Sequence, residues 1–279
     1  MNSHSNFAAW FAHRLQTVGA ALLLAIAFNA SAQTYRVGGT GSALGTLRLV
    51  VDALAAKDAR QVGISIVPNL GSSGSLRALQ AGAIEVALVS RELTQEEKNS
   101  GLVGFEYGRS PFVFLTNKPG VKGVTNSLVA QVLRGSTLVW PDGQPVRFVT
   151  RPESDGDNAY IAQFSADIAA ALKVAHKRPG MVMAATDQEA ADEAERLPGS
   201  LATNTLALVK SERRKLTVLD FNGHTPSSHA LAAGSYMHFK RFLIVTKGAP
   251  QGEARRLIDF IKSTPGRVIL EANGHVVAK

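Results

Sequence analysis

The chain has 279 residues, of which 45% are hydrophobic and 19% are charged; this excludes disordered and fibrous proteins and suffices for one large or two ordinary domains with real cores. The 30 Lys and Arg residues against 22 Asp and Glu give a net charge of +8, but they form no basic stripe, basic helix or aromatic platform, so we expect no nucleic-acid partner. The sequence contains no cysteine, which excludes disulfides, thiolate metal sites, cysteine nucleophiles and a lipid-modified N-terminal cysteine.

The N-terminal segment, residues 1–32, has the pattern of a secretory signal peptide. His13 and Arg14 precede an apolar run at residues 18–28, and Ala30-Ser31-Ala32 supplies small residues at a cleavage site. A membrane anchor is the alternative, but the run is shorter than the roughly 20 residues that span a bilayer. We therefore predict cleavage after Ala32, a mature chain that starts at Gln33, and a soluble protein of a Gram-negative periplasm.

The first half of the mature chain alternates strand-like and helix-like segments. We expect strands at residues 35–37, 62–67, 84–89 and 112–115 and helices that include Leu44 to Leu54 and Leu76 to Leu79. Gly- and Ser-rich turns separate them at residues 38–42 and 68–75. Strands that alternate with helices predict a parallel sheet covered by helices, which is the α/β class.

The second half continues the alternation. We expect helices at residues 128–133, ended by Gly135, at 158–174 and at 253–263, and strands at residues 146–150, 201–209, 216–220 and 241–246. No internal repeat and no low-complexity tract interrupts this pattern.

Three of the loops that lead from a strand into a helix have the composition of anion-binding loops. They are residues 39–43 (GTGSA), 71–75 (GSSGS) and 151–158 (RPESDGDN). Glycine lets the backbone approach a ligand, Ser and Thr add hydroxyl donors, and a helix N-terminus carries a partial positive charge. In open α/β sheets such loops meet at the carboxyl edge of the strands, so together they favour a small anion, although each alone could be a turn with an N-cap.

Other chemistries find no support in the sequence. No Walker lysine follows either Gly-rich loop, and no H-E-x-x-H, G-x-S-x-G or S-x-x-K motif is present. The histidines are widely spread, so we expect no metal site. We therefore expect no enzymatic activity, no catalytic residue and no cofactor.

The order of several short motifs resembles the phosphate-binding family of periplasmic solute-binding proteins of ABC transporters. The matching pieces, which span nearly all of residues 34–278, are TGS at 40–42, GSSGS at 71–75, GAIEVA at 82–87 before Ser90-Arg91, FVFLTN at 112–117, QVLRG at 131–135, WPDG at 140–143, Arg151, LPGS at 197–200 and STPG at 263–266. Each piece is weak, but their collinear order is fairly specific.

This resemblance implies a two-lobe fold whose interlobe cleft closes on an oxyanion by a hinge motion. Each lobe would be a mostly parallel sheet flanked by helices. Residues 33–114 plus 240–279 would form lobe 1, residues 115–239 would form lobe 2, and residues 112–116 and 239–244 would be the hinge strands.

The resemblance also implies the ligand contacts. Thr40, Gly41 and Ser42 match the first phosphate loop, Ser73 and Gly74 match the second, and Arg151 matches the arginine that pairs with the anion, a role that suits its planar fork of donors. Glu85 stands where the family has an aspartate that accepts the ligand's proton.

A departure from the family follows Arg151. The family's Ser-Gly-Thr is replaced by Asp155-Gly156-Asp157, and ionised carboxylates accept hydrogen bonds but do not donate them. Three readings remain open: these side chains turn outward, the alignment slips so that Ser154 becomes the donor, or the ligand is not phosphate.

The function that we infer from the sequence is capture of a small oxyanion, phosphate or a similar ligand, by a monomeric periplasmic protein that serves an ABC permease or a membrane sensor. The alternative is a two-lobe sensor or interaction protein that no longer binds phosphate and engages a membrane partner. An exported hydrolase is a third reading, but the sequence shows no recognisable pair of nucleophile and base for it.

Overall fold

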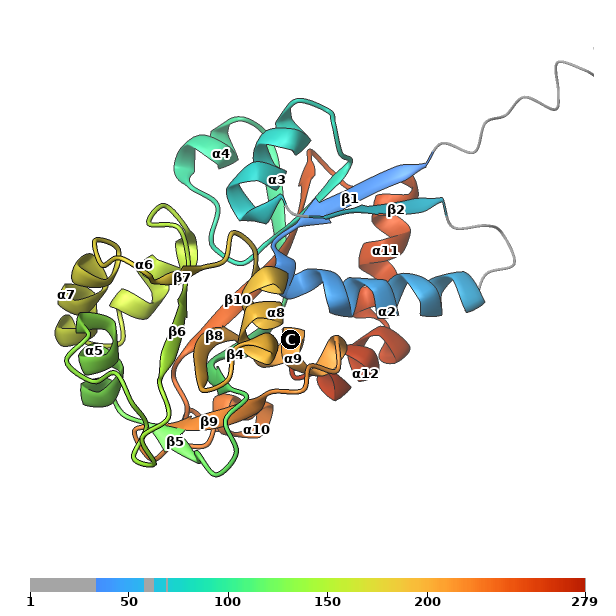
Figure 1. Cartoon of the computed structure of the whole chain (residues 1–279). Helices are drawn as coiled ribbons and strands as arrows, with labels where there is room; N and C mark the ends of the chain where they lie inside the picture. The colour runs from blue at the N-terminus through green and yellow to red at the C-terminus, as the bar shows by residue number, and fades with distance from the viewer. Residues whose placement is uncertain (1–33, 58–62, 69, 279) are drawn as a thin grey trace, which may run out of the picture. The chain divides into compact units, whose positions relative to one another are not determined.

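The computed structural model describes residues 34–57, 63–68 and 70–278, so the predicted signal peptide lies outside the described residues. Labels follow Figure 1. The strands are β1 (Tyr35–Gly39), β2 (Ile64–Val67), β3 (Val86–Val89), β4 (Leu102–Thr116), β5 (Gly123–Val124), β6 (Arg147–Thr150), β7 (Val182–Met183), β8 (Ser200–Thr205), β9 (Thr217–Phe221), β10 (Phe239–Lys247) and β11 (Val276–Val277). The helices are α2 (Gly41–Lys57), α3 (Gly71–Gln80), α4 (Gln95–Asn99), α5 (Asn126–Arg134), α6 (Gly156–Ala162), α7 (Ala166–Ala175), α8 (Asp187–Arg196), α9 (Leu206–Ser211), α10 (Ser228–Ala232), α11 (Gly252–Lys262) and α12 (Thr264–Ala272).

The strands run in the order β2-β1-β3-β10-β4-β8-β6-β7. At one end β1 pairs in parallel with β2 and β3, and at the other β6 pairs in parallel with β7 and β8. Between them, β10 and β4 are antiparallel to each other and to their outer neighbours β3 and β8. This is the α/β architecture expected from the alternation, with antiparallel pairing at the crossing strands β4 and β10, where β9 and β11 also pair antiparallel with β4.

The long strand β4 joins the two ends of the sheet. Its N-terminal part pairs with β10, and its last residues, from Phe112, pair with β8 and β9. Residues 110–116 are all buried, as expected where a strand is covered on both faces. Both predicted hinge segments therefore lie in β4 and β10, the strands that cross from one end to the other.

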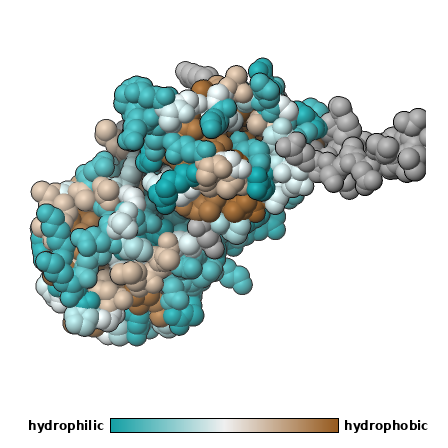
Figure 2. Space-filling model, turned by 90° about the horizontal axis from the view of Figure 1, so that it is seen from above, coloured by the Kyte–Doolittle hydropathy of each residue, from teal (hydrophilic) through white to brown (hydrophobic). Residues whose placement is uncertain are grey.

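The hydrophobic core is divided in the same way. One cluster, around Leu44, Phe242 and Leu257, joins α2, β10 and α11, and another, around Phe114, Leu133 and Ile168, joins β4, α5 and α7. In Figure 1, α5, α6 and α7 lie beside β6 and β7, whereas α11 and α12 lie near α2. The face seen in Figure 2 mixes hydrophilic residues with apolar patches. Within the described residues, no helix is long and apolar enough to cross a membrane.

Three predicted elements differ from the structure. The expected turn at residues 68–75 is helical from Gly71, where α3 begins. The expected helix at residues 158–174 is two helices, because Ser165 caps α7 with a hydrogen bond from the Ile168 amide. The expected strand at residues 201–209 ends at Thr205, whose side chain caps α9 in the same way. At Ser165 and Thr205 a hydroxyl residue inside an apolar run starts a new helix.

Candidate functional site

A cavity of about 770 Å³ lies where the predicted anion-binding loops meet. It is lined by the loop after β1, the start of α3, the end of β3, the loop after β6, and the start of β10. The strand β6 runs antiparallel to β1 and β3, so the loops at the carboxyl ends of the two sets of parallel strands face each other across this cavity. Of the expected site residues, Thr40, Ser73, Gly74, Arg151, Asp155, Gly156 and Asp157 line this cavity.

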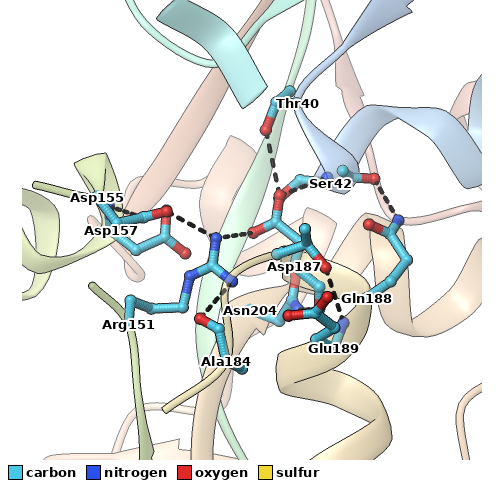
Figure 3. Close-up of polar contacts among 12 residues, drawn as sticks. Thr40, Ser42, Arg151, Asp155, Asp157, Ala184, Asp187, Gln188, Glu189 and Asn204 are labelled. Atoms are coloured by element: carbon cyan, nitrogen blue, oxygen red, sulfur yellow. Dashed lines mark hydrogen bonds and ion pairs between the residues drawn. The ribbon is translucent and has the colours of Figure 1, made fainter. Parts of the chain in front are cut away.

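The first loop already holds a carboxylate, that of Asp187. The Ser42 amide donates to Asp187 Oδ2 at 2.9 Å, and the Thr40 hydroxyl donates to the same oxygen at 3.3 Å (Figure 3). Gly41 permits this approach, because a Cβ there would collide with the Gln188 and Asp187 side chains. The loop thus presents donors to an anion, as its composition indicates, and in this structure the anion belongs to the chain itself.

The second loop is the first turn of α3. Gly71 has a φ of +63°, a backbone conformation that favours glycine. The N-cap residue is Leu70, whose hydrocarbon side chain leaves the first amides of α3 without a side-chain cap. The Ser72 hydroxyl accepts from the Ser90 amide at 3.0 Å and thereby ties the loop to the end of β3. Ser73 is exposed at the cavity, and its hydroxyl is 3.5 Å from the Arg91 guanidinium.

The third loop begins with Arg151, which is 5% exposed. Its Nη2 donates to Asp155 at 2.7 Å and lies 4.0 Å from Asp187, and its Nη1 donates to the Ala184 carbonyl at 3.2 Å. Burial lowers the pKa of Arg151, but the charges of Asp187 and Asp155 outweigh burial and raise it. The guanidinium is therefore charged and already engaged by acids of the chain.

The two acids that follow Arg151 both line the cavity, so they do not turn outward. Asp155 caps α6 by accepting from the Asp157 amide at 2.8 Å, while it also pairs with Arg151. Asp157 pairs with Lys240 of β10. Ser154 lines the cavity as well and is exposed.

Sequence reasoning missed Asp187 and Lys240. Lys240 is 3% exposed and lies in β10 between Phe239 and the apolar run at residues 242–245, and a charge beside such a run is a signal that the sequence offers. Asp187 follows Thr186, the cap of α8, and reads in the sequence as an ordinary first-turn acid. Arg91 and Arg241 also line the cavity, paired with Glu97 and Glu92.

The charges around Asp187 set its ionisation. Burial would raise the pKa of Asp187, but Lys240, Arg151 and the Ser42 hydrogen bonds outweigh burial and lower it. Burial also raises the pKa of Asp157, against the attraction of Lys240. Burial would lower the pKa of Lys240, but the charges of Asp157 and Asp187 outweigh burial and raise it. Asp187 is therefore ionised at neutral pH and faces two buried cations.

The structure does not bring Glu85 to the cavity. Its carboxylate accepts from the Arg36 amide at 2.5 Å and from the Arg36 guanidinium at 2.8 Å. Glu85 precedes β3 and so lies at the amino end of that strand, whereas Ser90 and Arg91 follow its carboxyl end and line the cavity. The prediction that Glu85 faces the ligand is therefore wrong for this structure, because Glu85 lies outside the cavity and pairs with Arg36. Within the part of the chain that the structure describes, no group of three His, Asp or Glu could hold a metal ion.

Comparison with known proteins agrees with the resemblance seen in the sequence. Residues 27–264 match the family model described as the PBP superfamily domain. The chain is 25% identical, over 75% of its length and 78% of the relative, to the phosphate-binding protein PstS of Borreliella burgdorferi (strain ATCC 35210 / DSM 4680 / CIP 102532 / B31).

Solved structures share the fold. A substrate-binding protein assigned to a phosphate ABC transporter of Clostridium perfringens, solved with bound phosphate, superposes with a TM-score of 0.74 at 19% identity, over 88% of this chain and 100% of that one. The periplasmic molybdate-binding protein of Azotobacter vinelandii superposes with a TM-score of 0.62 at 16% identity, again over 88% and 100%. Both similarities establish the two-lobe fold.

Proposed function

Because the chain belongs to the PBP superfamily, we propose that it is a periplasmic solute-binding protein that captures a small oxyanion of the phosphate class for ABC import or for sensing. The observation that carries this proposal is the convergence of three strand-to-helix loops on one cavity that also holds Arg151, Lys240 and Arg91. Backbone donors, hydroxyls and arginine forks together suit a compact anion with several oxygens. Relatives named for phosphate binding support the same ligand class.

The lobe limits that we propose are residues 33–114 plus 240–279 for lobe 1 and 115–239 for lobe 2. The division of the hydrophobic clusters supports them except at Phe112 and Phe114, which pack in the other cluster, since the cluster around Leu44 draws on residues 37–107 and 242–270. The cluster around Phe114 draws on residues 112–236. We also propose that the protein acts as a monomer by binding, without catalysis, and delivers its ligand to an ABC permease or a membrane sensor.

Calorimetry on the purified protein, dialysed free of phosphate, tests the proposed ligand class. We expect heat of binding with phosphate or with a related oxyanion such as sulfate, molybdate or tungstate. Melting temperatures provide a second readout, because a ligand at 100 times its Kd stabilises the folded state by about 2.7 kcal/mol. Absence of binding to every oxyanion would refute the proposal.

The proposed export rests on the leader and its Ala30-Ser31-Ala32 site. Mass spectrometry of protein from the native periplasm should show a chain that begins at Gln33. A chain that retains Met1 would contradict the proposed processing.

One observation favours the second candidate function, a two-lobe sensor or interaction protein that does not bind phosphate. Arg151 and Lys240 are each neutralised by an acid of the same chain, Asp155 and Asp157 respectively. A divalent anion would meet these carboxylates at close range, and buried like charges cost several kcal/mol. Under this reading the wild type binds no oxyanion but is retained by membrane fractions that carry its partner.

A further inference from the structure

The carboxylate of Asp187 lies where the donors of the cavity meet. It belongs to α8, on the side of β6 and β8, yet it reaches the loop between β1 and α2. One oxygen accepts from the Ser42 amide and the Thr40 hydroxyl, and the other faces Arg151 Nη2 at 4.0 Å (Figure 3). Asp187 is 6% exposed, so these contacts are largely shielded from water.

The backbone around Asp187 is held from both sides. The Asn204 amide group donates to the Asp187 carbonyl at 2.9 Å, and the neighbouring Gln188 donates to the Gly41 carbonyl at 2.9 Å and to Glu212 at 2.9 Å. These hydrogen bonds fix the backbone of Asp187 and its neighbour next to the first loop, so the position of the carboxylate does not depend on its side-chain rotamer alone.

The surroundings of the carboxylate keep one donor that it does not use. Within the described residues, Arg151 Nε is buried without a hydrogen-bond partner, on the same guanidinium whose Nη2 faces Asp187. A carboxylate has two oxygens, whereas a tetrahedral oxyanion has four and could accept from more donors. A buried donor without a partner is rare and costly, so Arg151 Nε points to an acceptor larger than the one present.

We propose that Asp187 is a built-in occupant of the anion position: its carboxylate bridges the first loop and Arg151 as a bound oxyanion would, and it holds the cleft closed without ligand. This inference rests on the proposed function, in which these same groups receive an oxyanion. It makes Asp187 a determinant of affinity, because an incoming phosphate must displace a carboxylate that is tethered at its position. A tethered group competes at a high effective concentration.

The test combines two measurements on the variants Asp187→Asn and Asp187→Ala. Small-angle scattering in anion-free buffer should show a larger radius of gyration for both variants than for the wild type, and added phosphate should restore the smaller value. Calorimetry should show at least tenfold tighter binding of inorganic phosphate to Asp187→Ala than to the wild type. The matched control is Asp192→Asn, which removes a carboxylate from the exposed side of the same helix, where Asp192 pairs with Arg214.

The two measurements separate this inference from the proposed function. If both variants keep the wild-type scattering profile in anion-free buffer, or bind phosphate no more tightly than a wild type that does bind it, Asp187 is not the occupant. If both variants open but neither they nor the wild type bind any oxyanion, the occupancy by Asp187 stands and the proposed oxyanion capture fails. The Asp187→Ala variant provides the answer if Asp187→Asn does not fold.

Discussion

Replacement of Lys240 by methionine tests the electrostatics of the cavity most directly. Lys240 is 3% exposed, its ammonium lies 4.8 Å from the centre of the Phe112 ring, and it pairs with the buried Asp157 carboxylate. In the Lys240→Met variant Asp157 keeps its burial and loses its cation. Removal of one partner of a buried ion pair costs about 3–5 kcal/mol. We expect a loss of that size in the free energy of unfolding at pH 7.

The loss should depend on pH. Burial raises the pKa of Asp157, and removal of Lys240 removes the main charge that opposes this rise. An acid whose pKa is higher in the folded state contributes stability below its unfolded pKa, and this contribution disappears as the pH rises through the folded pKa. The difference between Lys240→Met and the wild type should therefore be largest at neutral pH and shrink towards pH 4.

Urea denaturation at several pH values measures this effect. The matched control is Lys118→Met, because Lys118 is also buried but its partner Asp142 keeps 53% of its side-chain surface in water. We expect the control to cost about 1 kcal/mol or less. A double variant, Lys240→Met with Asp157→Asn, should recover most of the loss. Equal losses for Lys240→Met and Lys118→Met would refute the reasoning.

Three further predictions concern single residues. Arg151→Ala should weaken phosphate binding by about a hundredfold, since it removes charge-assisted donors, and unchanged affinity by calorimetry would contradict this. Asp155→Ser keeps a helix cap and removes a carboxylate, so calorimetry should show at least tenfold tighter phosphate binding; equal or weaker binding would count against it. Burial lowers the pKa of His275 to about 3. Below pH 6.5 the imidazole therefore binds a proton in the unfolded chain but not in the folded chain, and the free energy of unfolding should fall by about 1.4 kcal/mol per pH unit. Urea denaturation of His275→Gln should lack this component, and an unchanged pH dependence would exclude it.

Local patterns were sufficient to predict most elements of the fold. The apolar spacing of Leu44, Leu47 and Leu54 predicts α2, and Gly135 ends α5 in the left-handed conformation, as expected. The split at Ser165 was missed because an apolar face continues through it. Whether Ser165 caps a new helix or continues the existing one depends on tertiary packing, which local sequence spacing does not show.

The candidate site could be predicted only in part. Loop composition indicated Thr40, Ser73 and Arg151, which all line the cavity. The site role of Glu85 came from the resemblance to a family motif, whereas the predicted strand at residues 84–89 already puts Glu85 at the amino end of that strand, away from the carboxyl end where the loops lie. The contact of Asp187 with Ser42 joins residues 145 positions apart, and no local pattern encodes such a meeting.

The crossing strands β4 and β10 have a consequence for the order in which the chain folds. The first hydrophobic cluster needs Phe242 and Leu257 from the end of the chain, and the ion pair of Arg241 with Glu92 spans 149 residues. Contacts this distant in sequence form slowly. The cluster around Phe114 uses one contiguous segment, residues 112–236, so we expect it to form before the cluster around Leu44. Pulse-labelled hydrogen exchange should then protect amides of α5 and α7 before those of β1, and the opposite order would exclude this sequence of events.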